Sequence, residues 1–223
     1  ITFTLIFNTV AGINTGSVPP FLFNLAGITI WNYFTACLNG TSNTFGSNAG
    51  IFGKVYFPRI IVPLSIVISN LLKFGIQFFI FICFYLYYYL QGAAIGMNAT
   101  TLFFPLLIVM MGILGLGLGM FISSLVTKYR DFSNLVGFGV QLLMYVSAVM
   151  YPMALIKEKL PTYGWLVEYN PLAYVIETTR YMLLDVGHIS LLGLGYTFLV
   201  TISVFFVGVL IFNRTEKSFI DTV

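Results

Sequence analysis

The chain has 223 residues, of which only 8% are charged and 59% are hydrophobic, including 23 Phe and 14 Tyr. A soluble domain carries roughly 25% charged residues, so the charges here are too few to cover a water-soluble globule. The formal net charge of +3 is too small and too dispersed for a nucleic-acid binder, and two cysteines with one histidine leave no disulfide framework and no metal-ligand cluster.

The hydropathy of the chain predicts an all-α integral membrane protein with six transmembrane helices, because each span needs roughly 20 apolar residues. Residues 1–13 are apolar but too few to span, and we interpret them as the outer end of an incomplete first helix. A cleaved signal peptide is the alternative, although no basic region or cleavage site accompanies the stretch. The other spans are predicted at residues 21–42, 60–90, 102–126, 132–156 and 191–212 of a single transmembrane domain.

The basic residues of the loops predict which side of the membrane each loop faces. Six of them fall on one side and three on the other: Lys54, Arg59, Lys128, Arg130, Arg214 and Lys217 against Lys157, Lys159 and Arg180. The positive-inside rule places the first set in the cytosol, together with the tail at residues 213–223.

A separate short element is expected on the cytosolic side at residues 44–57. Pro58 and Pro63 bracket Arg59, and proline does not continue a helix. Ser47 or Asn48 would cap a short helix here. Two interpretations remain open: a linker with an interfacial aromatic anchor, or a docking element for a cytosolic partner.

Two spans contain unusual residues. Lys73 lies inside the third span, where a charge at mid-bilayer costs roughly 3 kcal/mol, so we favour a side chain that snorkels to the cytosolic face over one that faces a polar conduit. Gly115 and Gly119 in the fourth span form a small-xxx-small pair that lets another helix approach closely, with a hinge as the alternative.

Residues 157–190 on the external side are too many for a hairpin. Asn170-Pro171 divides them into two apolar halves, each too short to span, which is typical of re-entrant or interfacial helices. Glu177 and Arg180 are three residues apart and are expected to pair. Such backbone must be buried or line a cavity, which favours an external gate formed with Tyr169; an amphipathic pair on the membrane surface is the alternative.

The sequence contains none of the common catalytic motifs. Gly53-Lys54 is followed by Val55, so there is no Walker A loop, and no HExxH or GxSxG occurs. No carboxylate is firmly placed inside a span, which argues against ion-coupled transport. We therefore expect a transport subunit that is not itself an enzyme and that takes its energy from a separate cytosolic ATPase.

Residues 48–65 (NAGIFGKVYFPRIIVPLS) resemble the cytosolic loop of type-2 ABC export permeases, and more narrowly the permease subunit of O-antigen and related polysaccharide exporters. Four further segments agree: residues 23–34 (FNLAGITIWNYF), 128–132 (KYRDF), 169–173 (YNPLA) and 214–223 (RTEKSFIDTV). The resemblance covers nearly the whole chain.

The resemblance implies that two copies of the permease pair above two nucleotide-binding subunits, which hold ATP and Mg while this chain binds no cofactor. Residues 44–57 would be a coupling helix that docks on the ATPase through Phe52, Gly53, Lys54 and Tyr56. Residues 157–190 would be the external gate helices. The substrate would be an undecaprenyl-diphosphate-linked polysaccharide, as in lipopolysaccharide biosynthesis, moved outward across the bacterial inner membrane.

Aromatic side chains are expected to line the substrate path, because sugar rings pack their C–H faces on aromatic rings. The candidates are Trp31, Tyr33, Phe34, Tyr145 and Tyr151. Lys54, Arg59 and Lys73 are candidates to attract the diphosphate. Lipid-facing and interfacial positions explain the aromatic residues equally well, and the positive-inside bias explains Lys54 and Arg59.

Three other functions remain open. The first is a type-2 ABC permease for a teichoic acid, another glycolipid or a drug. The second is a membrane enzyme that acts on lipid-linked sugars, which would need clustered acid–base residues, whereas Glu168, Glu177, Asp185 and His188 are dispersed. The third is a scaffold without transport activity.

Overall fold

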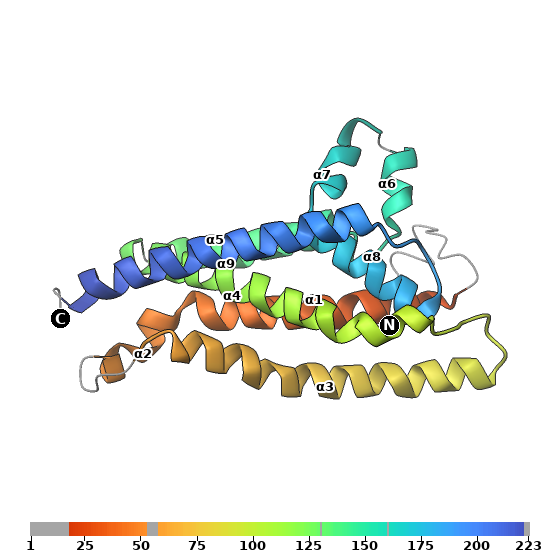
Figure 1. Cartoon of the computed structure of the whole chain (residues 1–223), viewed down its shortest axis with the longest axis horizontal. Coiled ribbons are helices and arrows are strands. Elements are labelled where there is room, and N and C mark those ends of the chain that lie inside the picture. The colour runs from red at the N-terminus through yellow and green to blue at the C-terminus, as the bar shows by residue number, and fades with distance from the viewer. Residues whose placement is uncertain (1–17, 53–57, 130, 160, 221–223) are drawn as a thin grey trace. The chain divides into compact units, whose positions relative to one another are not determined.

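The computed structural model describes residues 18–52, 58–129, 131–159 and 161–220. Within these ranges the chain forms helices and no strands, which confirms the predicted all-α class. In chain order the helices are α1 (Pro20–Ser42), α2 (Thr44–Phe52), α3 (Ile61–Leu90), the 3-10 helix η2 (Ala99–Phe103), α4 (Phe104–Lys128), α5 (Phe132–Val146), α6 (Met153–Lys159), the 3-10 helix η3 (Pro161–Tyr163), α7 (Gly164–Glu168), α8 (Pro171–Leu184) and α9 (Leu191–Ile220) (Figure 1).

Four helical segments of the described chain are long and apolar enough to cross a membrane: Pro20–Ser42, Ile61–Leu90, Ala99–Lys128 and Leu191–Glu216. They fall on four of the predicted spans. The predicted first span, residues 1–13, lies outside the described residues. α9 continues to Ile220, so most of the predicted cytosolic tail extends the last helix.

Several helices begin at or just before a proline. Pro20 is the first residue of α1, Pro171 is the first residue of α8, and Pro63 is the third residue of α3. The N–H groups of the first helical turn have no partner within the helix, so a residue that lacks this group is tolerated there.

The fifth predicted span, residues 132–156, is too long. α5 ends at Val146 after 15 residues, and α6 starts separately at Met153. Ala148 adopts a left-handed conformation with φ of 54°, which turns the backbone out of the helix. Pro152 has no N–H to donate to the Ala148 carbonyl, so a regular helix loses a hydrogen bond at this point.

The chain divides into two compact units, and each contains portions of the long helices. The first unit comprises Ile1–Asn32, Phe74–Val109 and Leu142–Thr197, and the second comprises Tyr33–Lys73, Met110–Gln141 and Phe198–Val223. α6, α7 and α8 therefore belong to the first unit, and α2 belongs to the second.

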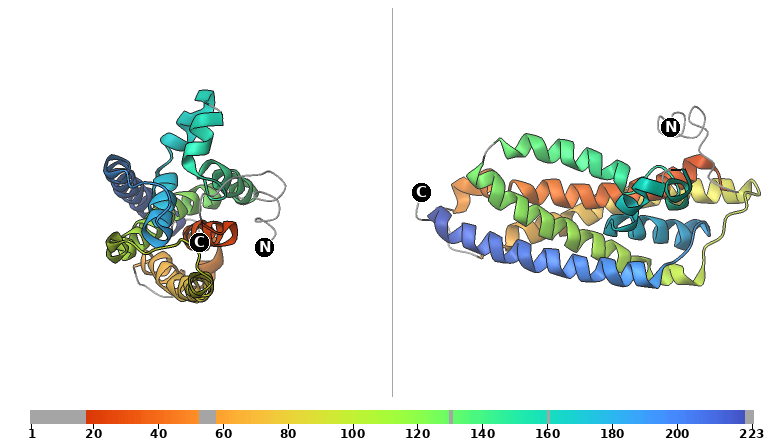
Figure 2. Two further views of the ribbon diagram at one scale, coloured as in Figure 1. Left: turned by 90° about the vertical axis from the view of Figure 1, so that its right-hand side faces the viewer. Right: turned by 90° about the horizontal axis from the view of Figure 1, so that it is seen from above.

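In the second unit, glycines of α4 bring this helix close to α1 and α9 (Figure 2). A Cβ atom on Gly115 would lie 2.9 Å from the Phe34 carbonyl oxygen of α1, and one on Gly117 would lie 2.8 Å from Cα of Phe205 in α9. The prediction that Gly115 and Gly119 allow close helix packing is confirmed. Because the neighbour is α1 of the same chain, these glycines are already used inside one copy and are no argument for a dimer.

In the first unit, aromatic rings join α3 to α1 and α4. The ring centroids of Phe21 and Phe84 lie 4.9 Å apart, and those of Phe78 and Phe104 lie 5.2 Å apart. The opposite face of α3 is exposed, with Phe79 68% accessible. Such a face suits contact with lipid or with another protein.

Candidate functional site

α2 is the short helix that corresponds to the predicted cytosolic coupling element. Only Asn43 separates it from α1, and Oγ1 of Thr44 donates a hydrogen bond to the Thr41 carbonyl at 2.7 Å. The helix thus begins before Ser47 and Asn48, and the prediction that either residue caps it is wrong. Asn48 lies inside α2, where its side chain donates to the Thr44 carbonyl at 2.9 Å.

An aromatic contact attaches α2 to α9 within the second unit. Phe45 is only 1% exposed, and its ring stacks on the ring of buried Phe212 with centroids 4.5 Å apart. Of the predicted ATPase contacts, Gly53, Lys54, Tyr56 and the side chain of Phe52 lie outside the described part of the chain. The structure therefore shows how α2 packs against α9, and it does not describe the side chains predicted to contact the ATPase.

A second contact joins the start of α3 to the same end of α9. Nη1 of Arg59 donates a hydrogen bond to the Glu216 carbonyl at 3.1 Å, and Nε lies 3.8 Å from the Glu216 carboxylate. Arg59 is buried at 7% exposure, so the guanidinium predicted to attract diphosphate is engaged with α9. The other such candidate, Lys73, is exposed on α3.

The predicted aromatic path divides into buried and accessible residues. Trp31 and Tyr33 are 4% exposed and Phe34 is fully buried, so all three pack inside the chain and are closed to a sugar in this conformation. Tyr145 at the end of α5 is 43% exposed. Tyr151 is partly buried and its hydroxyl donates a hydrogen bond to the Tyr145 carbonyl. Tyr145 is therefore the most accessible of the five candidates.

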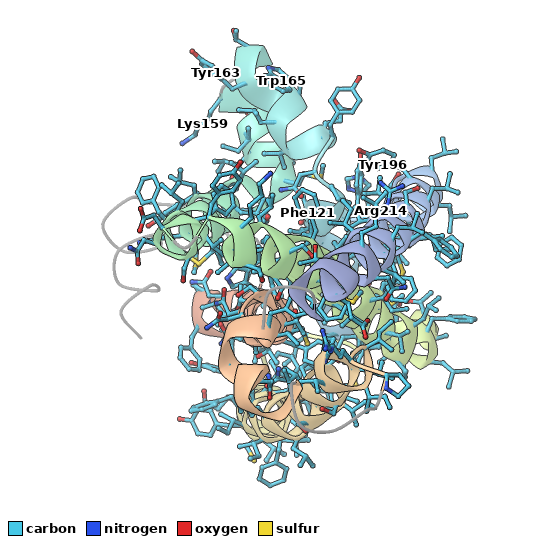
Figure 3. The ribbon with its side chains drawn as sticks, turned by 90° about the vertical axis from the view of Figure 1, so that its left-hand side faces the viewer. Phe121, Lys159, Tyr163, Trp165, Tyr196 and Arg214 are labelled. Atoms are coloured by element: carbon cyan, nitrogen blue, oxygen red, sulfur yellow. The ribbon has the colours of Figure 1, made fainter. Side chains whose placement is uncertain are left out.

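The segment predicted to be external, residues 157–190, consists of one exposed part and one buried part, both in the first unit. Figure 3 shows Lys159, Tyr163 and Trp165 together on the part from α6 to α7. Tyr163 is 58% exposed and Trp165 is 55% exposed, as expected for side chains at a membrane interface or against another protein. α8 differs, because 11 of its 14 residues are buried. An amphipathic pair that rests on the membrane surface does not describe α8.

Asn170 and Pro171 form the predicted break, and the structure shows how they start α8. Oδ1 of Asn170 accepts a hydrogen bond from the Leu172 N–H at 3.0 Å, while Nδ2 donates to Oγ of Ser147 at 3.0 Å. One side chain thus caps α8 and also attaches its start to the residue that follows α5. Tyr169, the gate candidate before the cap, is 68% exposed.

Replacing Asn170 by alanine is expected to lower the free energy of unfolding by about 1 kcal/mol, because the N-cap hydrogen bond is lost. Aspartate at this position keeps the acceptor for Leu172 and loses the donor to Ser147, so it should have a smaller effect. The apparent melting temperature of the purified protein measures both. The matched control is Asn213→Ala at an exposed position inside α9, which should be neutral. A neutral Asn170→Ala variant contradicts the capping role.

Arg180 and Glu177 form the predicted pair, with Nη1 3.7 Å from the Glu177 carboxylate. Both are buried, at 0% and 6% exposure, so neither faces an aqueous exit in this conformation. Arg180 also lies over the Phe23 ring, 3.9 Å from its centroid. Burial lowers the pKa of Arg180 to about 10 and the Glu177 carboxylate opposes that shift, so the guanidinium stays charged at neutral pH.

Several contacts of this site escaped the sequence analysis. Phe45 and Phe212 are two of 23 phenylalanines, and nothing in their spacing indicates that they meet. Glu216 carries a weak signal, because an acidic residue in a basic tail suggests a cationic partner. Gly27 carries no signal, although a Cβ atom there would lie 2.7 Å from Nη2 of Arg180.

The fold and these sites define a multi-pass membrane protein with a short helix, α2, packed on α9 and a buried helix, α8. The chain belongs to the ABC-2 type transporter family, whose family model matches residues 1–184. It is therefore a membrane subunit of a transporter.

Three relatives of this chain are each named O-antigen export system permease protein RfbA. Two from Klebsiella pneumoniae are 29% and 27% identical to this chain over 204 and 203 residues, covering 90% of this chain and 74% of each relative. One from Myxococcus xanthus is 23% identical over 161 residues, covering 71% of this chain and 58% of the relative.

Proposed function

We propose that this chain is the permease subunit of an ATP-driven exporter that moves an undecaprenyl-diphosphate-linked polysaccharide from the cytosolic to the outer side of the bacterial inner membrane. The names of the relatives support the polysaccharide as cargo. The carrier lipid follows from the resemblance of residues 48–65 to the loop of polysaccharide exporters. A separate nucleotide-binding subunit supplies the energy by hydrolysing ATP with Mg.

The observation that carries this proposal is the attachment of α2 on the basic side of the chain. A helix that is moved by an ATPase must be attached to the membrane domain, because otherwise its flexible linkers absorb the movement and the spanning helices do not move. The stacking of Phe45 on Phe212 attaches α2 to α9, and Arg59 on Glu216 attaches the start of α3 to the same helix. Thr44–Phe52 then presents its remaining surface to the partner.

The functional unit is proposed to be a pair of identical permeases, with α5 at the contact between them. α5 has no buried residue within a single chain, and a Cβ atom on Gly137 or Gly139 would meet nothing within 4 Å. Small residues let helix backbones approach closely in membranes. Phe138 and Tyr145 are exposed on this helix, and we propose that Tyr145 contacts the glycan beside the second copy.

The test is reconstitution of the chain with its nucleotide-binding partner in lipid vesicles. Undecaprenyl-diphosphate-linked glycan is expected to raise ATP turnover and to become accessible to a glycan-specific lectin on the far side. A partner unable to hydrolyse ATP is the control and should abolish transport. Stimulation by a teichoic acid precursor or a drug, without stimulation by the glycan, would overturn the proposed cargo. Failure to co-purify with any such ATPase would overturn the coupling.

A further inference from the structure

The backbone between α5 and α6 leaves carbonyl groups that helix hydrogen bonds do not satisfy. α5 ends at Val146, Ala148 is left-handed, and Pro152 cannot donate. Ser147, Ala148, Val149 and Met150 are all buried in the first unit, so their polar groups are shielded from water. Buried carbonyl groups without donors are costly, and more so at membrane depth.

Arg180 supplies donors to three carbonyl oxygens of the turn at residues 147–152. Its Nη1 donates to the carbonyls of Ala148 at 2.9 Å and Tyr151 at 3.1 Å. Its Nη2 donates to the Val149 carbonyl. Guanidinium offers five N–H donors in a rigid planar fork, a geometry that the single ammonium group of lysine does not reproduce. One side chain of α8 thus replaces the helix hydrogen bonds that the turn lacks.

The surroundings hold the guanidinium in this position. Glu177 lies one turn earlier on α8 and pairs with it at 3.7 Å, and the Phe23 ring of α1 covers it at 3.9 Å. The approach of α1 depends on Gly27, where any side chain would meet Nη2. Three parts of the first unit, namely α1, α8 and the turn after α5, therefore meet at one buried charge.

We propose that Arg180 is a positioning residue that terminates α5 and fixes the turn at residues 147–152 to α8, so that the turn and α8 move as one piece during export. The proposal rests on the proposed exporter function. Asn170 adds a second attachment, because its side chain joins the start of α8 to Ser147. Tyr151 of the turn donates a hydrogen bond to the carbonyl of Tyr145 at the accessible end of α5. The position of the turn therefore affects the position of that end.

Hydrogen–deuterium exchange of the purified permease in lipid nanodiscs tests the proposal. The variant Arg180→Lys keeps the charge but satisfies fewer carbonyls. The amides of residues 147–151 and Met153 are expected to exchange about tenfold faster in this variant, corresponding to one charged hydrogen bond. Amides of α8 should stay within about twofold of wild type, because its helix and cap remain. Glu177→Gln retains the hydrogen bonds from Arg180 to the carbonyl groups. It should therefore accelerate amide exchange in the turn less than Arg180→Lys does.

Two comparisons decide the outcome. Arg214→Lys makes the same chemical change at an exposed position of α9 and should leave amide exchange in the turn at the wild-type rate. Unchanged exchange at residues 147–153 in Arg180→Lys would overturn the proposal, as would uniform acceleration across the whole chain, which marks a general loss of stability. In reconstituted complexes the same variant should retain at least half of the glycan-stimulated ATP turnover and lose about tenfold in transport.

The two proposals fail in different ways. The exchange measurement requires neither partner nor substrate, so it can reject the Arg180 role while wild-type export stands. Wild-type complexes that do not respond to glycan reject the exporter function whatever the exchange shows. Equal losses of ATP turnover and transport in Arg180→Lys would overturn the positioning role, because a coupled loss indicates damage to the whole subunit.

Discussion

Replacing Phe45 by alanine is expected to abolish export while the protein remains inserted in the membrane. Removing a buried phenylalanine side chain costs about 3–5 kcal/mol, and here the loss falls on the stacking contact that attaches α2 to α9. α2 would keep its sequence for the partner but lose its support. Stimulation of ATP turnover by the glycan, measured in reconstituted complexes, should fall to the basal level.

The control for this variant is Phe206→Ala, also on the second unit, because Phe206 of α9 is 61% exposed. It removes the same side chain without removing a buried contact and should leave export close to wild type. Phe212→Ala, which removes the other ring of the stack, should reproduce the defect of Phe45→Ala. Wild-type export by Phe45→Ala would show that the aromatic attachment of α2 is unnecessary.

The second large effect is expected from Gly208→Ala in α9. A Cβ atom at this position would lie 2.3 Å from the carbonyl oxygen of Gly117 in α4, so the clash is with backbone and no rotamer change relieves it. The helices must separate, which we expect to cost about 1–3 kcal/mol. Gly117→Ala should lower stability by a similar amount, since its Cβ atom would lie 2.8 Å from Cα of Phe205.

Gly195 provides the matched control on the same helix, because a Cβ atom there meets nothing within 4 Å. Alanine has the higher helix propensity, so Gly195→Ala should be neutral or slightly stabilising. The apparent melting temperature of each purified variant in the same detergent measures the difference. Equal melting temperatures for Gly208→Ala and Gly195→Ala would contradict the close packing of α4 and α9.

The spanning helices could be predicted from sequence because membrane insertion depends on the composition of a whole segment. Residues 60–90 form one apolar run, and α3 covers Ile61–Leu90. The Asn170-Pro171 break was equally predictable, because both the cap and the missing N–H are properties of those two residues. The pairing of Glu177 with Arg180 follows from helical spacing alone.

The end of α5 could not be predicted in this way, because hydropathy does not register backbone hydrogen bonds. Residues 147–152 are mostly apolar, so hydropathy continues past the end of α5. The side chain that donates hydrogen bonds to the carbonyl groups of this turn, Arg180, comes from a distant part of the sequence. The burial of Trp31 and Tyr33 could not be predicted for a related reason. The sequence shows that Trp31 and Tyr33 are aromatic, but their burial inside the chain depends on how the helices pack, which the sequence pattern does not indicate.

The unequal lengths of α3 and α5 have a consequence for the surrounding bilayer. At 1.5 Å per residue, the 30 residues of α3 extend about 45 Å and the 15 residues of α5 only about 22 Å, against a hydrocarbon core of roughly 30 Å. A bilayer in contact with α5 would have to thin locally, at a cost that grows with acyl-chain length. Covering α5 with protein removes that cost, so the proposed association of two copies through α5 should strengthen in thicker bilayers. Membrane thickness would then act as a regulator of assembly.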